Sequence, residues 1–184
     1  MGELIDDLLT LSRTGRQELK LQRVDLGALV RELVREAALE TGKHKLEWTV
    51  GALPVVMADP ALLRIVLQNL LSDALKYTRP RPVARIAVQA RAAQGGVAEI
   101  SVRDNGVGFD PRFRDKLFGV FQRLHRDEEF EGLGIGLATA RRIVHRHEQR
   151  IWGEGETNKG AVFTFTMLQA EMEATHESSA DTAG

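Results

Sequence analysis

The 184-residue sequence contains no cysteine. This absence excludes disulfides, thiolate metal sites and thiol catalysis, and it is compatible with a reducing compartment. No apolar run is long enough to cross a bilayer, and the amino terminus lacks a secretory pattern. Charge of one sign is not in excess, because 25 basic and 26 acidic residues are interspersed without the basic stripe of a nucleic-acid binder. We therefore expect a soluble, cytoplasmic protein or fragment, with no membrane insertion and no nucleic-acid partner.

The length and the apolar content of 43% suit one globular domain with an appended segment. Apolar residues at helical spacing predict four helices, and alternating or short apolar runs predict five strands. The expected helices cover about 3–12, 26–42, 60–77 and 133–147, and the expected strands 46–50, 55–57, 83–92, 97–102 and 161–168. Strands and helices mix without a regular strand–helix–strand rhythm. This pattern predicts an α+β two-layer sandwich with a mixed, mostly antiparallel sheet.

The two ends of the chain differ from its middle. The helix at 3–12 is short and apolar on one side, so it needs a partner. It either packs on its own domain or is the end of a bundle helix, and a polar connection follows it to about residue 23. Residues from about 170 onward are small and polar, and we expect a disordered tail there.

Asn69 and Asp73 stand four residues apart on the expected helix at 60–77, so both lie on one face, which Lys76 and Tyr77 continue. One interpretation is a solvent-facing polar stripe whose lysine favours the end of the helix dipole. The other is a row of oxygen ligands facing a phosphate-bound magnesium ion, because Mg²⁺ prefers hard oxygen donors and substrate phosphates. The spacing alone favours the first.

The stretch Asp104-Asn-Gly-Val-Gly108 directly follows a strand-like run. As a purely structural feature it is an Asx turn in which glycines accept positive φ. As a site, it places the Asp104 carboxylate where it accepts a hydrogen bond from an adenine amino group. A buried carboxylate that needs this donor discriminates well, because a base without it leaves a charge unsatisfied. Gly106 and Gly108 then let the base approach the backbone.

Glycines at 132, 134 and 136 open a later helix. They do not form a dinucleotide fingerprint, because Leu137 stands where that motif has glycine and no strand precedes them. A glycine-rich entry to a helix offers free N–H groups to phosphates, although a flexible linker has the same composition. Among the five histidines, His145 and His147 face different sides of a helix. We therefore expect surface histidines rather than a histidine metal site.

Four segments, taken in order and spacing, resemble the N, G1, F and G2 boxes of sensor histidine kinases over about residues 25–168. Residues 2–13 look like the end of the second helix of the dimerisation and histidine-phosphotransfer domain. The residue sequence from Phe121 onward and the short lid resemble those of bacteriophytochrome-type kinases. The four segments are Asn69-Leu-Leu-Ser-Asp73-Ala-Leu-Lys76-Tyr77-Thr, Asp104-Asn-Gly-Val-Gly108, Phe118-Gly-Val-Phe121-Gln-Arg-Leu and Gly132-Leu-Gly-Ile-Gly136-Leu.

The resemblance implies the Bergerat (GHKL) ATPase fold, with helices on one face of the sheet and a bundle helix before it. It implies ATP and magnesium as cofactors. By this carry-over Asp104 reads adenine, Asn69 and Asp73 manage magnesium and phosphates, Lys76 contacts phosphate and Tyr77 lines the base pocket. The implied domains are 1–23 (bundle helix and linker), 24–169 (ATP-binding catalytic domain) and 170–184 (tail).

The lid completes the implied site. By the resemblance, the glycines at 132–136 shape the lid and its phosphate contacts, and Phe118 and Phe121 anchor the lid. A purely structural role for the two phenylalanines, packing in the core, differs little from anchoring the lid. The full implied ATP-binding set is Asn69, Asp73, Lys76, Tyr77, Asp104, Gly106, Gly108, Phe118, Phe121, Arg123, Gly132, Leu133, Gly134, Gly136 and Leu137.

Three departures from the family pattern bear on activity. Asp73 replaces an asparagine, which adds negative charge beside a triphosphate and removes an amide donor, so we expect weakened or altered ATP binding. Glu148 and Gln149 stand where two glycines are usual, which alters only the helix end. No histidine stands in the phosphoacceptor context, so the chain cannot autophosphorylate in the family's usual way.

Three functions therefore stay open. The first is the catalytic domain of a two-component histidine kinase that transfers the γ-phosphoryl group to a histidine outside this chain. Its partners would be an acceptor-histidine domain and a response regulator receiver domain, with a possible homodimer through the N-terminal helix. The second is a nucleotide-binding regulatory module with weak or no kinase activity because of Asp73. The third, an ATPase of the gyrase or MutL kind, is disfavoured by the phenylalanine lid and the leading helix.

Overall fold

The computed structural model describes residues 2–40, 42, 44–123, 130, 132 and 134–171. Its main feature is a five-stranded sheet in which only the β2–β4 pair is parallel. A separate antiparallel pair joins the short strands β1 (Gln22–Asp25) and β3 (Val55–Ala58). In spatial order the main sheet contains β2 (Leu46–Val50), β4 (Ala84–Ala92), β5 (Val97–Asp104), β7 (Gly160–Leu168) and β6 (Ile151–Glu156).

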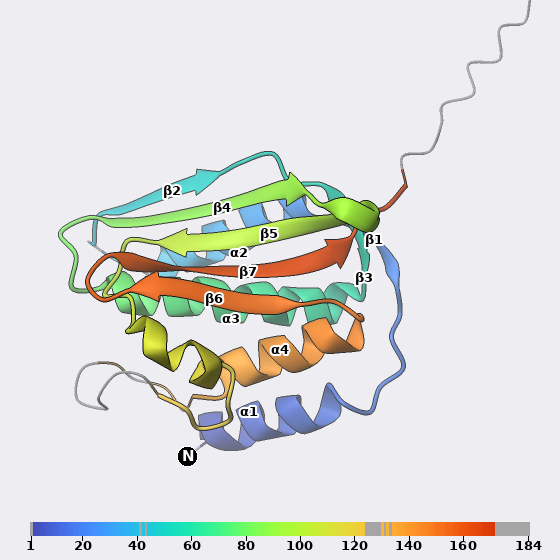
Figure 1. The fold of residues 1–184 in the computed structure, drawn as a ribbon, viewed down its shortest axis with the longest axis horizontal. Helices are drawn as coiled ribbons and strands as arrows, with labels where there is room; N and C mark the ends of the chain where they lie inside the picture. The colour runs from blue at the N-terminus through green and yellow to red at the C-terminus, as the bar shows by residue number, and fades with distance from the viewer. Residues whose placement is uncertain are drawn as a thin grey trace, which may run out of the picture.

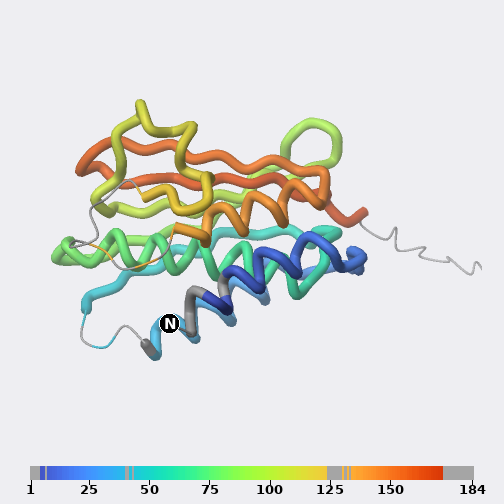
Figure 2. The backbone as a smooth tube through the Cα atoms, turned by 90° about the horizontal axis from the view of Figure 1, so that it is seen from below, coloured from blue at the N-terminus to red at the C-terminus, as the bar shows by residue number. Residues whose placement is uncertain are grey.

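The helices all lie on one face of this sheet (Figures 1 and 2). Among them, α1 packs against α4 and not directly on the sheet. The arrangement confirms the predicted two-layer α+β sandwich with a mixed, mostly antiparallel sheet. The helices are α1 (Gly2–Arg13), α2 (Leu26–Glu40), α3 (Pro60–Thr78) and α4 (Gly136–Arg146), with short 3₁₀ turns η1 (Gln94–Gly96) and η2 (Pro111–Lys116).

The core lies between α3 and the sheet. Leu63, Leu67 and Leu70 of α3 are fully or almost fully buried, as are Ile100 and Phe165 on the strands. Burying each such side chain contributes about 1.5–3 kcal/mol. Most of the circumference of this helix is apolar, and Asn69, Asp73 and Lys76 form a half-buried polar stripe on it.

Asp59 fixes where α3 begins. Its carboxylate accepts hydrogen bonds from the N–H groups of Ala61 (3.1 Å) and Leu62 (3.2 Å), and Pro60 occupies the first turn. The Asp59 N–H in turn donates to Nε2 of His147 at 3.0 Å, at the end of α4. This contact sets the ends of the two helices against each other.

Some expectations about element limits were incomplete. The connection predicted to run to residue 23 ends in β1, and the strand β6 was not predicted. The last helix begins at Gly136, because Gly134 and Ile135 are not helical. The predicted tail from 170 lies, beyond residue 171, outside the described residues.

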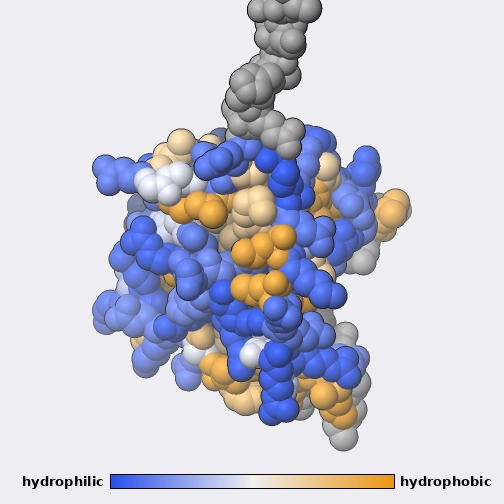
Figure 3. Space-filling view, turned by 90° about the vertical axis from the view of Figure 1, so that its right-hand side faces the viewer, coloured by the Kyte–Doolittle hydropathy of each residue, from blue (hydrophilic) through white to orange (hydrophobic). Residues whose placement is uncertain are grey.

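On the side where the chain leaves α1 and enters β1, the described residues form no broad apolar area. Polar side chains dominate that face, and apolar ones gather only in small groups (Figure 3). None of the helices in the described ranges is long and apolar enough to cross a membrane.

Candidate functional site

The polar stripe of α3 faces the beginning of α4. Asn69, Asp73 and Lys76 are half-buried on this stripe. Gly136 packs so closely on α3 that a Cβ atom there would lie 2.8 Å from Oδ1 of Asn69. A larger residue at 136 would require the Asn69 amide to move. The contact brings the N-terminus of α4, with its free N–H groups, beside the polar stripe, which is an arrangement suited to an anion.

Lys76 is the cation of this stripe. Its Nζ atom lies 3.4 Å from Oδ1 of Asp73 and 4.7 Å from the ring centroid of Tyr77. Gly132 adjoins it, since a Cβ atom at that glycine would lie 3.1 Å from the same Nζ atom. Leu133, also predicted for the site, lies outside the described residues.

Asp104 ends β5, and its carboxylate is buried, with 6% of the residue exposed. Oδ1 accepts a hydrogen bond from the Gly106 N–H at 2.8 Å, and the backbone of Ala161 also donates to the carboxylate. The neighbouring Val107 N–H donates to the Tyr77 carbonyl at 3.1 Å. A side chain at Gly106 would collide with that same carbonyl, so the close approach of α3 to the turn requires glycine.

Burial raises the pKa of Asp104 to about 6, because a charged carboxylate loses hydration in this position. The two backbone donors oppose this shift by stabilising the charged form. Asp73 adds to the shift through charge repulsion, whereas Arg81 opposes it. Near neutral pH, Asp104 is therefore a desolvated carboxylate whose remaining acceptor capacity favours a hydrogen-bond donor.

Asp104 lines a pocket. Four of its lining residues were predicted from sequence, namely Tyr77, Asp104, Gly108 and Leu137. The sequence missed the others. The signal for two of them lay in strand pairing, since Ala161 pairs with Asp104 across β5 and β7 and alternation puts residue 163 on the same face. The missed residues are Phe109, Leu117, Gln122, Ala161 and Phe163.

The two predicted lid phenylalanines behave differently. Phe118 packs edge-on against Phe163, with ring centroids 6.2 Å apart. Phe121 is 59% exposed and adopts a φ of 59°, while its N–H donates to the Gly134 carbonyl at 3.0 Å. The expectation of core packing is therefore wrong for Phe121, because its backbone, not its ring, connects the two segments.

Arg123 and Phe130 bring the far end of the lid to the pocket. The Arg123 guanidinium donates to the Phe130 carbonyl. The Phe130 ring meets Tyr77 edge-on, with centroids 5.0 Å apart. Gly134 lies beside the backbone of Gln122 and the side chain of Arg123. Of the predicted set, Tyr77, Asp104, Gly108 and Leu137 line the pocket, whereas Phe121 is exposed.

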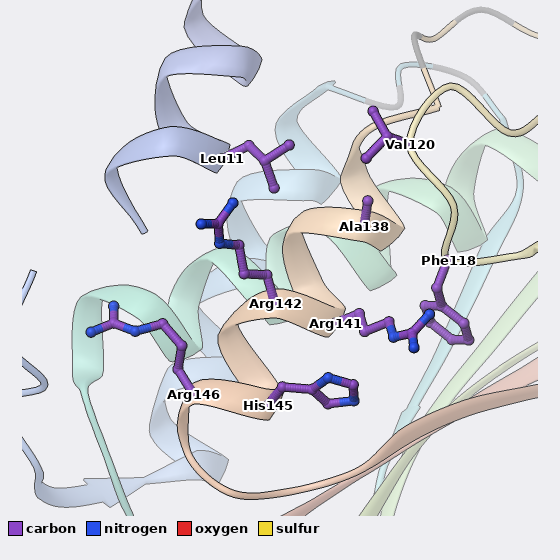
Figure 4. A pocket seen from close by; sticks show the side chains of 8 residues that line it. All are labelled: Leu11, Phe118, Val120, Ala138, Arg141, Arg142, His145 and Arg146. Carbon is purple, nitrogen blue, oxygen red and sulfur yellow. The ribbon is translucent and has the colours of Figure 1, made fainter. Parts of the chain in front are cut away.

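A second cavity of about 530 Å³ lies between α1 and α4 (Figure 4). The Arg146 guanidinium donates to the carbonyls of Thr14 and Gln17, which ties the segment after α1 to α4. The cavity combines an apolar wall with a basic one. Its lining residues are Leu11, Phe118, Val120, Ala138, Arg141, Arg142, His145 and Arg146.

The histidines divide into two groups. His44 and His145 are exposed, as expected for surface histidines. His147 is half-buried and bonded at both ring nitrogens, with Nδ1 2.8 Å from the Ile143 carbonyl and Nε2 accepting from Asp59. For His147 the expectation of a plain surface residue is wrong. His125 and His176 lie outside the described residues.

Comparison with known proteins places the chain among ATPases. Residues 58–171 match the family described as histidine kinase-, DNA gyrase B- and HSP90-like ATPases. The chain is 38% identical over 170 residues to cyanobacterial phytochrome A of Nostoc sp., covering 91% of the chain and 22% of that protein. It is 36% identical over 172 residues to the adaptive-response sensory kinase SasA of Thermosynechococcus vestitus, covering 91% of the chain and 45% of that protein.

Solved structures agree. Full-length ShkA in complex with AMPPNP superimposes with a TM-score of 0.78 at 30% identity, covering 94% of the chain and 36% of that structure. The catalytic domain of the histidine kinase ThkA has the same fold, with a TM-score of 0.69 at 23% identity over 82% of the chain and 96% of that structure. The chain spans less than half the length of the two sequence relatives, cyanobacterial phytochrome A and SasA.

Proposed function

The chain belongs to the histidine kinase-, DNA gyrase B- and HSP90-like ATPases and is the ATP-binding catalytic domain of a sensor histidine kinase, and we propose that it binds magnesium-ATP and delivers the γ-phosphoryl group to a histidine outside this chain. The observation that carries this proposal is the buried Asp104 carboxylate in an apolar pocket next to a helix N-terminus. The apolar walls suit the faces of a purine ring, and the carboxylate suits its amino group.

Each described group then has a physical role. Asp104 accepts the adenine amino hydrogen, while Tyr77 and Leu137 cover the ring. The phosphates extend toward Lys76 and the start of α4, where positive charge and free N–H groups meet. Residues Gly106 and Gly108 let the base approach the backbone. Catalysis rests on positioning, because phosphoryl transfer needs little covalent chemistry from the protein.

The donors on α3 fit a magnesium ion. The Asn69 amide oxygen and the Asp73 carboxylate are hard oxygen ligands on one half-buried face, and these two residues would hold the ion. Bound there, magnesium supplies charge neutralisation for the β- and γ-phosphates. Asp73 also pairs with Lys76, so the lysine and a bound ion would compete for one carboxylate.

A second candidate function rests on that ion pair. If Asp73 holds Lys76 away from phosphate, the domain binds nucleotide weakly and acts as a regulatory module whose lid position reports ATP. The two functions share a pocket and differ in turnover.

The surrounding parts follow from the same proposal. Residues 1–23 would be the end of the dimerisation and phosphotransfer helix with its linker, which here lies along α4 through the Arg146 contacts. Residues 24–169 would be the catalytic domain and 170–184 its tail. A receiver domain and a second copy of the kinase would be partners of the whole protein.

The deciding experiment combines this chain with a separately prepared acceptor-helix protein and ATP labelled on the γ-phosphate. Label that becomes bound to histidine, and is therefore stable to base and labile to acid, supports the kinase. Nucleotide binding in calorimetry without transfer supports the regulatory module. Absence of any nucleotide binding, with and without magnesium, contradicts both.

A further inference from the structure

Arg81 lies in the Arg79-Pro80-Arg81-Pro82 segment that ends α3, and its guanidinium donates to three backbone carbonyls. Nε donates to the Asn105 carbonyl at 2.8 Å. Nη2 donates to the carbonyls of Gly106 at 2.8 Å and Asn158 at 2.6 Å. An arginine that satisfies three carbonyls in one place holds those carbonyls in fixed orientations, because its planar donors have a rigid geometry.

The first of these bonds acts on Asp104 through a single peptide unit. The Asn105 carbonyl and the Gly106 N–H belong to the same planar peptide group. Arg81 donates to the carbonyl end of this group, and the N–H end donates to Oδ1 of Asp104 at 2.8 Å. Fixing one end of a planar unit fixes the direction of the other, and the positive charge also polarises the N–H.

The third bond reaches the other side of the pocket. Asn158 lies in the turn between β6 and β7, and its N–H donates to the Val107 carbonyl at 2.7 Å. Arg81 therefore joins the turn after β5 to the turn before β7. The strand β7 then supplies Ala161, whose backbone is the second donor to Asp104. Both backbone donors to the carboxylate depend on turns that Arg81 holds.

We propose that Arg81 is a positioning residue for adenine recognition, which orients the Asp104 carboxylate by clamping the Asn105–Gly106 peptide unit and the Asn158 turn. The inference rests on the proposed nucleotide site but adds a residue outside the four motifs. Arg81 does not line the pocket, so it acts through the backbone and not through the base.

The charge of Arg81 gives this role a signature that simple packing lacks. Arg81 lowers the pKa of Asp104 against the larger effect of burial. Among the described residues, the other titratable groups facing this carboxylate are Asp73, whose charge raises its pKa, and Tyr77 in the pocket wall, both on α3. Removing the guanidinium takes away one of the groups that oppose burial and the Asp73 charge, so the pH at which half of Asp104 is ionised rises.

The test compares Arg81→Met, Arg81→Lys and a control, Arg85→Met. Arg85 is near the same turn, but its guanidinium is exposed and pairs with Glu47 at 2.8 Å on the surface. In the nucleotide-free protein, carbon NMR of the Asp104 carboxyl gives its titration midpoint, and the Gly106 amide shift reports its hydrogen bond. Calorimetry with Mg-ATP over a pH series gives the dissociation constant.

We expect Arg81→Met to raise the Asp104 midpoint, move the Gly106 amide, and weaken ATP binding on the order of tenfold, the effect of about one lost hydrogen bond. Arg81→Lys retains the charge but not the three-carbonyl geometry, so it weakens binding while its midpoint stays near that of the wild type. Arg85→Met changes affinity less than twofold.

An Asp104 midpoint and a Gly106 amide that do not move in Arg81→Met overturn the inference, whether or not ATP binds. Equal losses of affinity in Arg81→Met and Arg85→Met overturn it too. If Arg81→Met does not fold, Arg81→Lys decides by the same NMR signals, with an unmoved Gly106 amide as the contrary result. Failure of the wild type to bind ATP contradicts the proposed function instead, and the ligand-free signals still test Arg81.

Discussion

Lys76 and Asp73 form an ion pair within one turn of α3, with Nζ of the lysine 3.4 Å from Oδ1 of the aspartate. Each side chain is about one-fifth exposed, at 20% and 19%, so water screens the pair only in part. Burial raises the pKa of Asp73, and the lysine opposes this shift. A triphosphate must therefore compete with Asp73 for the nearest cation.

Replacing this aspartate with asparagine removes the competitor. We expect Asp73→Asn to strengthen Mg-ATP binding on the order of tenfold, because Lys76 becomes available and a negative charge leaves the phosphate region. Isothermal titration at low salt measures the change. Ser72→Asn, at the adjacent exposed position of the same helix, is the control and should leave the affinity unchanged. Equal affinities of Asp73→Asn and the wild type would show that the ion pair does not limit binding.

The raised pKa of Asp104 predicts how ATP binding depends on pH. The ionised carboxylate is a strong acceptor for the adenine amino hydrogen, whereas the protonated carboxyl group is a weaker acceptor and carries a hydrogen of its own. The affinity for ATP should therefore decrease as the pH falls through about 6. ATP itself titrates in this range, and Asp104→Asn corrects for it because an amide does not ionise. The difference between the two pH profiles belongs to Asp104. Parallel profiles for wild type and variant would exclude this role.

The same variant should be more stable than the wild type. Burial raises the folded-state pKa of Asp104 to about 6, above that of an aspartate in the unfolded chain, so ionisation destabilises the fold as the pH rises between the two values. At pH 7, Asp104→Asn should gain about 1–3 kcal/mol in free energy of unfolding while losing ATP affinity. Below pH 4 the gain should vanish. Urea unfolding at the two pH values measures this, and a gain that is the same at both contradicts it.

The sequence predicted the elements that are stabilised locally. Asp59 and Pro60 are typical of a helix start and predict where α3 begins. Two runs of alternating apolar and polar residues on either side of adjacent glycines predict the hairpin of β4 and β5. In contrast, β1 is a four-residue strand among charges, and β6 contains two glycines that obscure its pattern. Both strands exist because β3 and β7 pair with them, and a sequence read locally does not contain that pairing.

The site divides along the same line. Asp104 and Asn69 could be named as candidates because they lie in contiguous segments whose order and spacing resemble those of a known family. Ala161 and Phe163 come from a distant strand and enter the pocket only through its register with β5. Arg81 lies in the Arg-Pro-Arg-Pro segment after α3, and nothing in that segment indicates which carbonyls its side chain will meet.

Glu148 occupies a position after α4 at which its backbone has a φ of 58°, in the left-handed region that favours glycine. Glu148→Gly should therefore stabilise the protein by about 0.5–1 kcal/mol, because the strain relieved exceeds the extra chain entropy of glycine. Thermal and urea unfolding measure the effect. Glu148→Ala removes the carboxylate but retains the strain, so it should give no gain. A gain of equal size in both variants would point to charge instead.

His147 joins the end of α4 to the start of α3 through both of its ring nitrogens. Nε2 accepts from the Asp59 N–H, and Nδ1 faces the Ile143 carbonyl. His147→Leu leaves the Asp59 N–H without its acceptor, while the Ile143 carbonyl still accepts from the backbone N–H of residue 147, and the change should cost about 1–3 kcal/mol in free energy of unfolding. His145→Leu, two residues earlier and exposed, is the matched control and should change it by less than about 0.5 kcal/mol. Because the Asp59 N–H at the start of α3 loses its acceptor, hydrogen exchange should also increase there in His147→Leu alone. Unchanged exchange there, with equal stability of the two variants, would show that packing without this hydrogen bond holds the two helices together.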